Sequence, residues 1–200
     1  MKENNHYNAI VIGTSHGGMN ALKFLLPKLP ATFSMPIIVV QHIGALSESN
    51  WIEAFDNYCQ LHVKEADEKE KIEKGIVYIA PPNYHLLVER NETFSLSIDQ
   101  RVNYARPSID VLFESAALVF QNYLIGILLT GANNDGASGI KKISESGGLT
   151  IVQDPETAES PYMPSAAIEV TTPDYVLDLK KIKKLIIKLH LTNTQLRYET

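Results

Sequence analysis

The sequence predicts an α/β fold: a doubly wound, mostly parallel β-sheet with helices on both faces and an added β-hairpin. Three observations predict this class. Apolar segments rich in β-branched residues alternate with helical patterns along the chain. These segments are continuously apolar, which is typical of parallel strands buried on both faces. One pair of shorter segments, 85–89 and 93–98, flanks a polar turn and predicts the hairpin.

The first predicted element is a buried strand of four apolar residues that begins at Ala9 and ends at Ile12. A turn with three glycines follows, and helical periodicity begins at Met19. Glycines suit a tight turn because they accept positive φ and close backbone approach. The turn places Ser15 at the mouth of the helix, where free N–H groups and the helix dipole favour a developing negative charge. The sequence therefore predicts a position for a nucleophile here.

The later elements follow from the same patterns. We expect strands at 36–42, 76–80, 124–129 and 149–153, and helices at 48–58, 109–120 and 177–191. Trp51, Phe55 and Tyr58 share one helical face and are predicted to lie in the core. The charged segment 67–74 predicts a solvated loop. The C-terminal helix carries lysines opposite its apolar face, which suits a membrane surface or a partner, although packing on the sheet with the lysines in water is the favoured interpretation.

Composition limits the classes of function. The chain has 44% hydrophobic and 20% charged residues, which is ordinary for a globular enzyme. Its net charge of −5 gives no reason to expect nucleic acid as a partner. The single cysteine, Cys59, excludes an internal disulfide and fits a reducing compartment. No apolar run approaches the roughly 18 residues that cross a bilayer. We therefore expect a soluble, cytoplasmic protein with one domain over residues 1–200, its core at about 8–190.

Polar, reactive residues follow three of the predicted strands. Ser15 follows the first strand, His42 the second, and Asp135 the strand that ends at Leu129. In open parallel sheets the site forms outside the carboxyl ends of the strands. Serine needs an adjacent base, histidine is a suitable base at neutral pH, and a carboxylate orients the imidazole. The three residues together predict a nucleophilic triad.

Each of these residues also has a structural interpretation. Ser15 suits a helix cap, His42 suits a hydrogen bond to a neighbouring carbonyl, and Asp135 before Gly136 suits a turn or a helix cap. The segment 13–17 matches G-x-S-x-G, but α/β-hydrolases have the chain order Ser, Asp, His, whereas the order here is Ser, His, Asp. The motif alone is therefore weak evidence for that class.

The spacing of the other histidines indicates no metal site, and the glycines match no motif for a nucleotide cofactor. His16 is either a second site histidine or, as we favour, a solvent-facing turn residue, and His85 is interpreted as structural. The remaining three histidines are interpreted as incidental, with no metal-ligand spacing: His6, His62 and His190. A dinucleotide fingerprint would need glycine where Ser15 stands, and no phosphate-binding loop of the Gly-Lys-Ser/Thr type is present.

Longer blocks of sequence carry a stronger signal. In chain order they are Val11-Ile12-Gly13-Thr14-Ser15-His16-Gly17-Gly18, Val40-Gln41-His42, Val63-Lys64-Glu65-Ala66, Tyr78-Ile79-Ala80-Pro81 with His85, Arg106-Pro107-Ser108-Ile109-Asp110-Val111-Leu112-Phe113, Leu129-Thr130-Gly131, Asn134-Asp135-Gly136-Ala137, and Met163-Pro164 with Ala166-Ala167-Ile168. With these blocks the chain resembles the catalytic domain of chemotaxis protein-glutamate methylesterases, the CheB family, over nearly its whole length.

The resemblance implies hydrolysis of glutamyl γ-methyl esters on cytoplasmic receptor helices, and in some members deamidation of receptor glutamines. It implies that Ser15 is the nucleophile, His42 the general base and then acid, and Asp135 the orienting carboxylate. The backbone N–H groups of His16 and Ala132 are the expected oxyanion donors. Two further residues match family positions near the site and are candidate substrate contacts: Arg106 and Met163.

Some features depart from the family pattern. His16 is bulky where many members have a small residue, and Ala132-Asn133 stands where Met-Gly is common. Few residues precede the first strand, so the sequence as given lacks the receiver domain that usually covers the site. Three alternatives follow: a site that is constitutively open, regulation by a separate protein such as a response regulator, or work in a signalling system other than chemotaxis. Three hypotheses stay open: a methylesterase or amidase acting on a methylated receptor-like protein, a serine esterase with another substrate, and a non-catalytic module that binds receptor or kinase helices.

Overall fold

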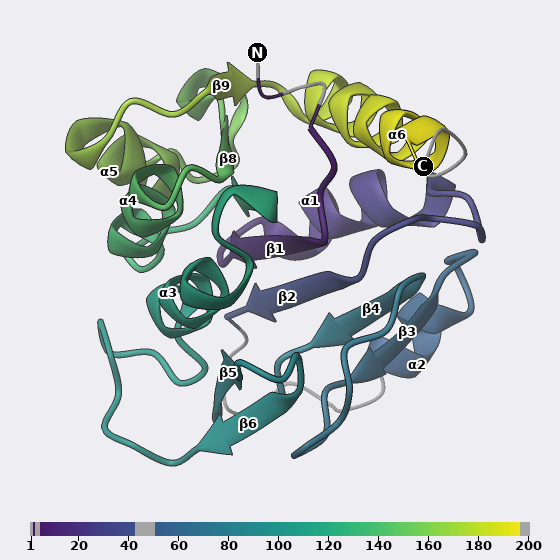
Figure 1. Cartoon of the computed structure of the whole chain (residues 1–200). Helices are drawn as coiled ribbons and strands as arrows, with labels where there is room; N and C mark the ends of the chain where they lie inside the picture. Colours follow the sequence, from purple (N-terminus) through teal and green to yellow (C-terminus); the bar gives the residue numbers. More distant parts are fainter. Residues whose placement is uncertain (1, 3–4, 43–50, 197–200) are drawn as a thin grey trace.

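The main sheet of this computed structural model has seven strands joined by parallel pairings, in the order β3-β4-β2-β1-β7-β8-β9 (Figure 1). The structure describes residue 2 and residues 5–42 and 51–196. The strands are β1 (Ala9–Thr14), β2 (Ile37–Gln41), β3 (His62–Glu65), β4 (Ile76–Ile79), β7 (Leu124–Leu128), β8 (Leu149–Gln153) and β9 (Tyr175–Leu177). A separate antiparallel hairpin consists of β5 (His85–Val88) and β6 (Phe94–Ser97). The predicted fold class is confirmed.

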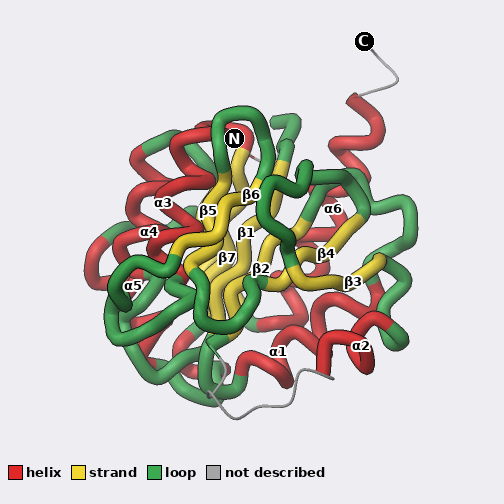
Figure 2. The backbone as a smooth tube through the Cα atoms, turned by 90° about the horizontal axis from the view of Figure 1, so that it is seen from below, coloured by secondary structure: helices red, strands yellow, loops and turns green. Residues whose placement is uncertain are grey.

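Helices cover both faces of the sheet (Figures 1 and 2). One face packs against α1 (Gly18–Leu25), α2 (Trp51–Asp56) and α6 (Leu179–Leu196). The other face packs against the hairpin and against α3 (Ile109–Phe120), α4 (Ala137–Glu145) and α5 (Tyr162–Val170). Three short 3-10 helices complete the secondary structure of the described residues: Leu26–Lys28, Gln121–Tyr123 and Pro155–Thr157.

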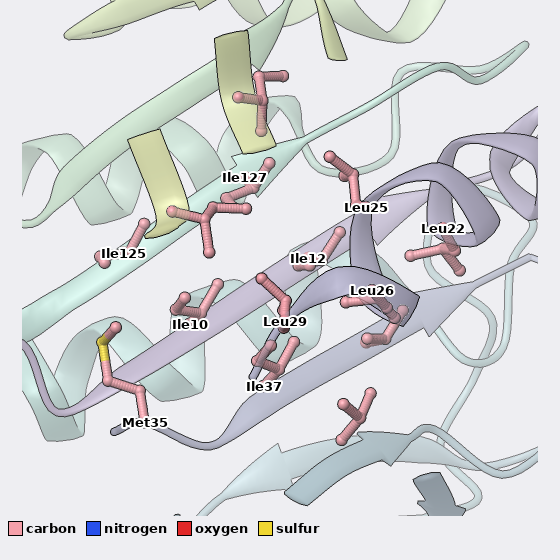
Figure 3. Packing of buried hydrophobic residues seen from close by; sticks show 14 of the residues in the cluster. Ile10, Ile12, Leu22, Leu25, Leu26, Leu29, Met35, Ile37, Ile125 and Ile127 are labelled. Atoms are coloured by element: carbon pink, nitrogen blue, oxygen red, sulfur yellow. The ribbon is translucent and has the colours of Figure 1, made fainter. Parts of the chain in front are cut away.

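The central strand β1 is buried on both sides, which explains its continuous apolar sequence. Ile10 and Ile12 pack with the helices on the α1 face, beside residues of β7, as Figure 3 shows. Ala9 and Val11 belong to the cluster on the α3 face, because successive strand residues point to opposite faces. Side chains on both faces thus fix β1 in place and hold the turn that follows it.

The strand order places a topological switch point at β1. The chain leaves β1 for β2 on one side and later returns to β7 on the other side. Because both pairings are parallel, the carboxyl ends of β1, β2 and β7 lie at the same edge of the sheet. Such a switch point is where open α/β sheets form their ligand-binding crevice.

Several elements lie outside what the sequence patterns predict. No predicted element corresponds to β3, β9, α4 or α5. The predicted C-terminal helix 177–191 is wrong at its start, because Leu177 ends β9 and α6 begins at Leu179. The apolar face of α6 packs on the sheet, and in the described part of the chain no helix is both long enough and apolar enough to cross a membrane.

The predicted core position of Tyr58 is wrong. Its side chain is 74% exposed, because α2 ends at Asp56 and the helical spacing from Trp51 and Phe55 is not continued. Phe55 is buried as predicted, and Trp51 is half-buried against the same cluster. The predicted first turn of this helix, 48–50, lies outside the described residues.

His190, interpreted from the sequence as incidental, is a buried core residue of α6. Its ring stacks on Phe33, with ring centroids 5.0 Å apart, and its Nδ1 accepts a hydrogen bond of 3.1 Å from the backbone N–H of Ser34. Burial lowers the pKa of His190, because the charged ring loses its hydration.

Because His190 is buried, we expect the protein to lose stability in mild acid. The pKa of His190 is lower in the folded state than its ordinary value of about 6.5 in the unfolded chain. The stability that the neutral ring contributes is therefore fully present above about pH 6.5, and it is lost as the pH falls through the pKa of the folded state. We expect the free energy of unfolding of the wild type to exceed that of His190→Gln at pH 7, and this advantage to narrow by pH 5. Urea unfolding at several pH values measures it. His62→Gln, at an exposed histidine, is the control, and an advantage that stayed constant with pH would contradict the assignment.

Candidate active site

The turn after β1 brings Ser15 to the switch point. The backbone N–H of Ser15 donates to the carbonyl of Thr130 in the loop after β7 (3.0 Å), and its carbonyl accepts from the N–H of Gly18 (2.9 Å). Gly17 has a φ of 79°, which side chains other than glycine rarely adopt. A Cβ on Gly18 would collide with the side chains of Thr14 and Gln41. The glycines are therefore required by the turn that positions Ser15.

Gln41 connects the loops after β1 and β2. It is the last residue of β2 and is buried, and its Nε2 donates both to the carbonyl of Ser15 (2.9 Å) and to the carbonyl of His42 (2.7 Å). The two residues expected to act as nucleophile and base are thus held by one side chain. Sequence reasoning did not assign this role, although an amide at the end of an apolar strand was a visible signal.

His42 and Asp135 form a close pair at the same edge. His42 Nε2 lies 2.9 Å from Asp135 Oδ2; the His42 side chain is 13% exposed and Asp135 is fully buried. Because a carboxylate only accepts, the proton of the neutral ring resides on Nε2 and the lone pair on Nδ1. The amide Nδ2 of Asn133 lies 3.5 Å from that Nδ1.

Asp135 is held by the N-terminus of α3. Its Oδ2 accepts from the backbone N–H of Ile109 (2.7 Å), and its Oδ1 accepts from the Ser108 hydroxyl (2.8 Å) and the backbone N–H of Asp110 (3.1 Å). Burial alone raises the pKa of Asp135, but the hydrogen bonds from His42, Ile109 and Ser108 outweigh it and lower the pKa below its ordinary value. The carboxylate is therefore ionised at neutral pH.

Asp110 makes the reciprocal contact. It lies in the first turn of α3, and its Oδ1 accepts from the backbone N–H groups of Gly136 (2.9 Å) and Gly139 (2.7 Å) at the start of α4. Burial, with the nearby charge of Asp135, raises the pKa of Asp110 to about 6. The Nδ2 of Asn103 joins the two carboxylates, 2.8 Å from Asp110 Oδ2 and 3.3 Å from Asp135 Oδ1.

A cleft of about 320 Å³ opens over these residues. Ser15 and His42 both line it, while Asp135 lies buried beneath. The wall is completed by residues of the loop before α3 and the loop after β7: Arg101, Asn103, Tyr104, Ala105, Arg106, Pro107 and Asn133. The structure thus brings the serine, histidine and aspartate predicted from the strand ends to one place.

The two residues expected to supply oxyanion N–H groups are both exposed and lie in the loops after β1 and β7. His16, directly after Ser15, has an exposed side chain with its Nε2 3.8 Å from Glu159 Oε1, as the solvent-facing interpretation predicts. Ala132 is exposed in the loop after β7. Their backbone groups belong to the two loops that meet at Ser15.

The two candidate substrate contacts lie in different surroundings. Arg106 lines the cleft, and its Nη1 donates to the carbonyls of Ile98 (2.6 Å) and Asp99 (2.9 Å). Met163 is fully buried in α5 and packs against Gly131 so closely that a Cβ there would collide with it. Its side chain thus packs under the loop after β7 and is not among the residues that line the cleft, and its role as a substrate contact stays a prediction.

His85 has structural contacts, as interpreted from the sequence. Its side chain is buried, with Nε2 3.0 Å from the carbonyl of Gln100 and Nδ1 accepting from the backbone N–H of Ser108 (3.2 Å). It therefore joins the hairpin to the start of α3. Among the residues that the structure describes, no group of three or more His, Cys, Asp or Glu side chains is placed to hold a metal ion.

Comparison with known proteins assigns the family. The CheB methylesterase family model matches residues 10–186, a range that runs from β1 into α6 and includes the whole cleft. The chain belongs to the CheB methylesterase family. A relative from Leptospira interrogans, named a putative protein-glutamate methylesterase/protein-glutamine glutaminase, is 57% identical over 96% of this chain and 100% of its own length.

More distant members of the CheB family share the same fold. The protein-glutamate methylesterase/protein-glutamine glutaminase of Thermotoga maritima is 36% identical over 90% of this chain and 53% of its own length. The crystal structure of the Thermotoga maritima CheB methylesterase catalytic domain matches with a TM-score of 0.86 and 35% identity, over 92% of this chain and 100% of that one. The resemblance stated from the sequence is confirmed at the level of family and fold.

Proposed function

We propose that this chain hydrolyses γ-methyl esters of glutamyl side chains on a methylated chemoreceptor or receptor-like protein, and that it releases methanol. Membership of the CheB family supports the class of reaction. The observation that carries the mechanism is the meeting of Ser15, His42 and Asp135, from three strand ends, at one cleft. Serine, imidazole and buried carboxylate are the parts required for acyl transfer.

In the proposed first step, Ser15 Oγ attacks the ester carbonyl carbon and His42 Nδ1 takes the hydroxyl proton. Nδ1 is the available base because Nε2 already donates to Asp135. Asp135 stays ionised and stabilises the imidazolium, in line with its lowered pKa. The tetrahedral intermediate collapses when His42 returns the proton to the leaving oxygen, and methanol departs.

The developing oxyanion needs preorganised donors. We assign these to the backbone N–H groups of His16, in the turn of Ser15, and of Ala132, in the loop after β7 that bonds to Ser15. One such donor is typically worth about 3–4 kcal/mol of the barrier. The assignment places no demand on the His16 side chain, which faces solvent beside Glu159.

The second step hydrolyses the acyl-enzyme. Water attacks the Ser15 ester while His42 again takes a proton, and the products are a glutamyl carboxylate and the free serine hydroxyl. The same residues serve glutamine deamidation, where ammonia replaces methanol as the leaving group. Both reactions consume one water per bond cleaved.

Methanol release from a methylated receptor fragment tests this function. We expect the wild type to release radiolabelled methanol and Ser15→Ala to release it more slowly by a factor on the order of 10⁶. Ammonia release from a glutamine-bearing fragment tests the amidase reaction in the same way.

A serine-directed phosphonate probe separates the remaining hypotheses. Labelling at Ser15 without methanol release would indicate an esterase with another substrate. Absence of both labelling and methanol release would instead favour the binding-module hypothesis and contradict our proposal.

A further inference from the structure

The loop between β6 and α3, residues 98–108, runs from the hairpin to the start of α3 (Figure 1), and part of it lines the cleft. Within this loop, Arg106 stabilises the backbone through its two hydrogen bonds to the carbonyls of Ile98 and Asp99. Val102 and Ala105 pair across a two-residue turn, with N–H···O distances of 3.1 and 2.8 Å. The loop therefore holds a defined shape at the wall of the cleft.

The turn places an unfavourable residue at its tip. Asn103 and Tyr104 have φ angles of 50° and 62°, the left-handed conformation of a type I′ turn. Asparagine and glycine are the usual residues at such positions, whereas a bulky side chain with positive φ is a rare outlier. Tyr104 thus occupies a position that its own backbone preference opposes, and among the positive-φ residues it is one that lies at the cleft, where such outliers are often found.

The two turn residues point in opposite directions. Asn103 points inward and joins Asp110 to Asp135 through its Nδ2. Tyr104 points outward, is 96% exposed and still lines the cleft with Ser15. The inward contacts fix the backbone of the turn on the buried carboxylates, so that the exposed ring is attached at a defined point of the cleft wall.

Among the described residues that line the cleft there are two arginines and no carboxylate. Exposed Arg101 lies beside Tyr104, with its Nη1 3.4 Å from the Tyr104 carbonyl, and Arg106 lines the same wall. The carboxylate of Glu159, from the segment before α5, lies near the exposed side chain of His16 and outside the cleft lining. The wall with Tyr104 is therefore the side that attracts carboxylates.

We propose that Tyr104 and Arg101 form a docking surface for the acidic helical segment that carries the ester. The inference rests on the proposed function, because a segment with several methylatable glutamates carries carboxylates beside the ester. One glutamyl side chain reaches Ser15, and the backbone of its helix lies across the rim, on Tyr104. Tyrosine supplies a large, rigid contact area at low entropic cost, and Arg101 pairs with carboxylates one or two helical turns from the ester.

The test compares kcat/KM on two substrates, the methylated receptor fragment and a blocked glutamate γ-methyl ester of one residue. Tyr104→Gly removes the ring and suits the positive φ, and Arg101→Gln removes the charge. For each variant we divide kcat/KM on the fragment by kcat/KM on the small ester. We expect Tyr104→Gly and Arg101→Gln each to lower this ratio about tenfold, and Tyr104→Phe to keep most of the wild-type ratio. The Arg101 effect should shrink in high salt.

Matched controls exist elsewhere on the surface. Tyr58→Ala removes a tyrosine that is 74% exposed outside the cleft lining, and Arg90→Gln removes an exposed arginine in the hairpin turn. Both controls should leave the ratio at its wild-type value. A binding titration of the fragment to Ser15→Ala, with and without Tyr104→Gly, gives the same comparison without turnover, and we expect the second change to weaken binding about tenfold.

The outcomes separate the two proposals. If the wild type hydrolyses neither substrate, the proposed function fails, and the binding titration still decides the docking surface. A ratio of kcat/KM values that stays unchanged in Tyr104→Gly and Arg101→Gln would overturn the docking surface. If kcat/KM falls equally on both substrates, the ratio is also unchanged, and the turn then only positions Asp135. Failure of the fragment to bind Ser15→Ala would overturn it as well.

Discussion

Ser15→Ala is expected to lower kcat for ester hydrolysis by a factor on the order of 10⁶, as loss of a serine nucleophile does in other triads. The folded state should be nearly unaffected, with the free energy of unfolding within about 0.5 kcal/mol of the wild type. The structural contacts of Ser15 explain this, because the bonds that fix the turn come from its backbone N–H and carbonyl. Methanol release and urea unfolding measure the two quantities.

Ser138→Ala is the matched control for this result. Ser138 is an exposed serine in the first turn of α4 and is not part of the cleft wall. It should retain wild-type turnover and stability. Substantial hydrolysis by Ser15→Ala would assign the nucleophile to another residue.

Asp135→Asn is expected to lower both turnover and stability. Turnover should fall about 10⁴-fold, because the amide no longer holds His42 in the reactive tautomer. Every contact of both carboxylate oxygens comes from a donor: Ser108, Asp110 and Asn103 on Oδ1, and Ile109 and His42 on Oδ2. Whichever oxygen becomes NH₂ then faces donors, so the free energy of unfolding should fall by about 1–3 kcal/mol.

Analogy with other triads would lead one to expect little change in stability from this substitution, but the buried contacts of Asp135 with the start of α3 imply a loss. Asp154→Asn is the control, because Asp154 also caps a helical turn, through the N–H of Glu156 (3.0 Å), but near the surface. It should cost much less stability and no turnover. A stable but inactive Asp135→Asn would mean that the bonds to α3 contribute little to folding.

The sequence predicts the site well where a general rule applies. Continuous apolar strands imply a parallel sheet, and the carboxyl ends of its strands then collect Ser15, His42 and Asp135 at one edge. Short edge strands such as β3 and β9 lack this apolar signal because they are only partly buried. The prediction that Tyr58 lies in the core is wrong because the helical pattern does not reveal where the helix ends.

Contacts between loops leave no such pattern. Asn103 bridges two carboxylates that are 7 and 32 residues away, and no spacing in the sequence indicates it. His190 looks like any polar residue of an amphipathic helix, yet the fold packs it on Phe33. Both roles come from tertiary structure, which one sequence read by periodicity does not contain.

The exchanged helix caps have a consequence for cooperativity. Asp135, from the loop that starts α4, closes the N-terminus of α3, and Asp110, from α3, closes the N-terminus of α4. Neither helix can undock locally without exposing the amide groups of the other. Partly unfolded forms are therefore disfavoured if they free the Asp135 carboxylate while α3 and α4 stay docked. The reactive geometry is gained or lost together with the packing of these two helices.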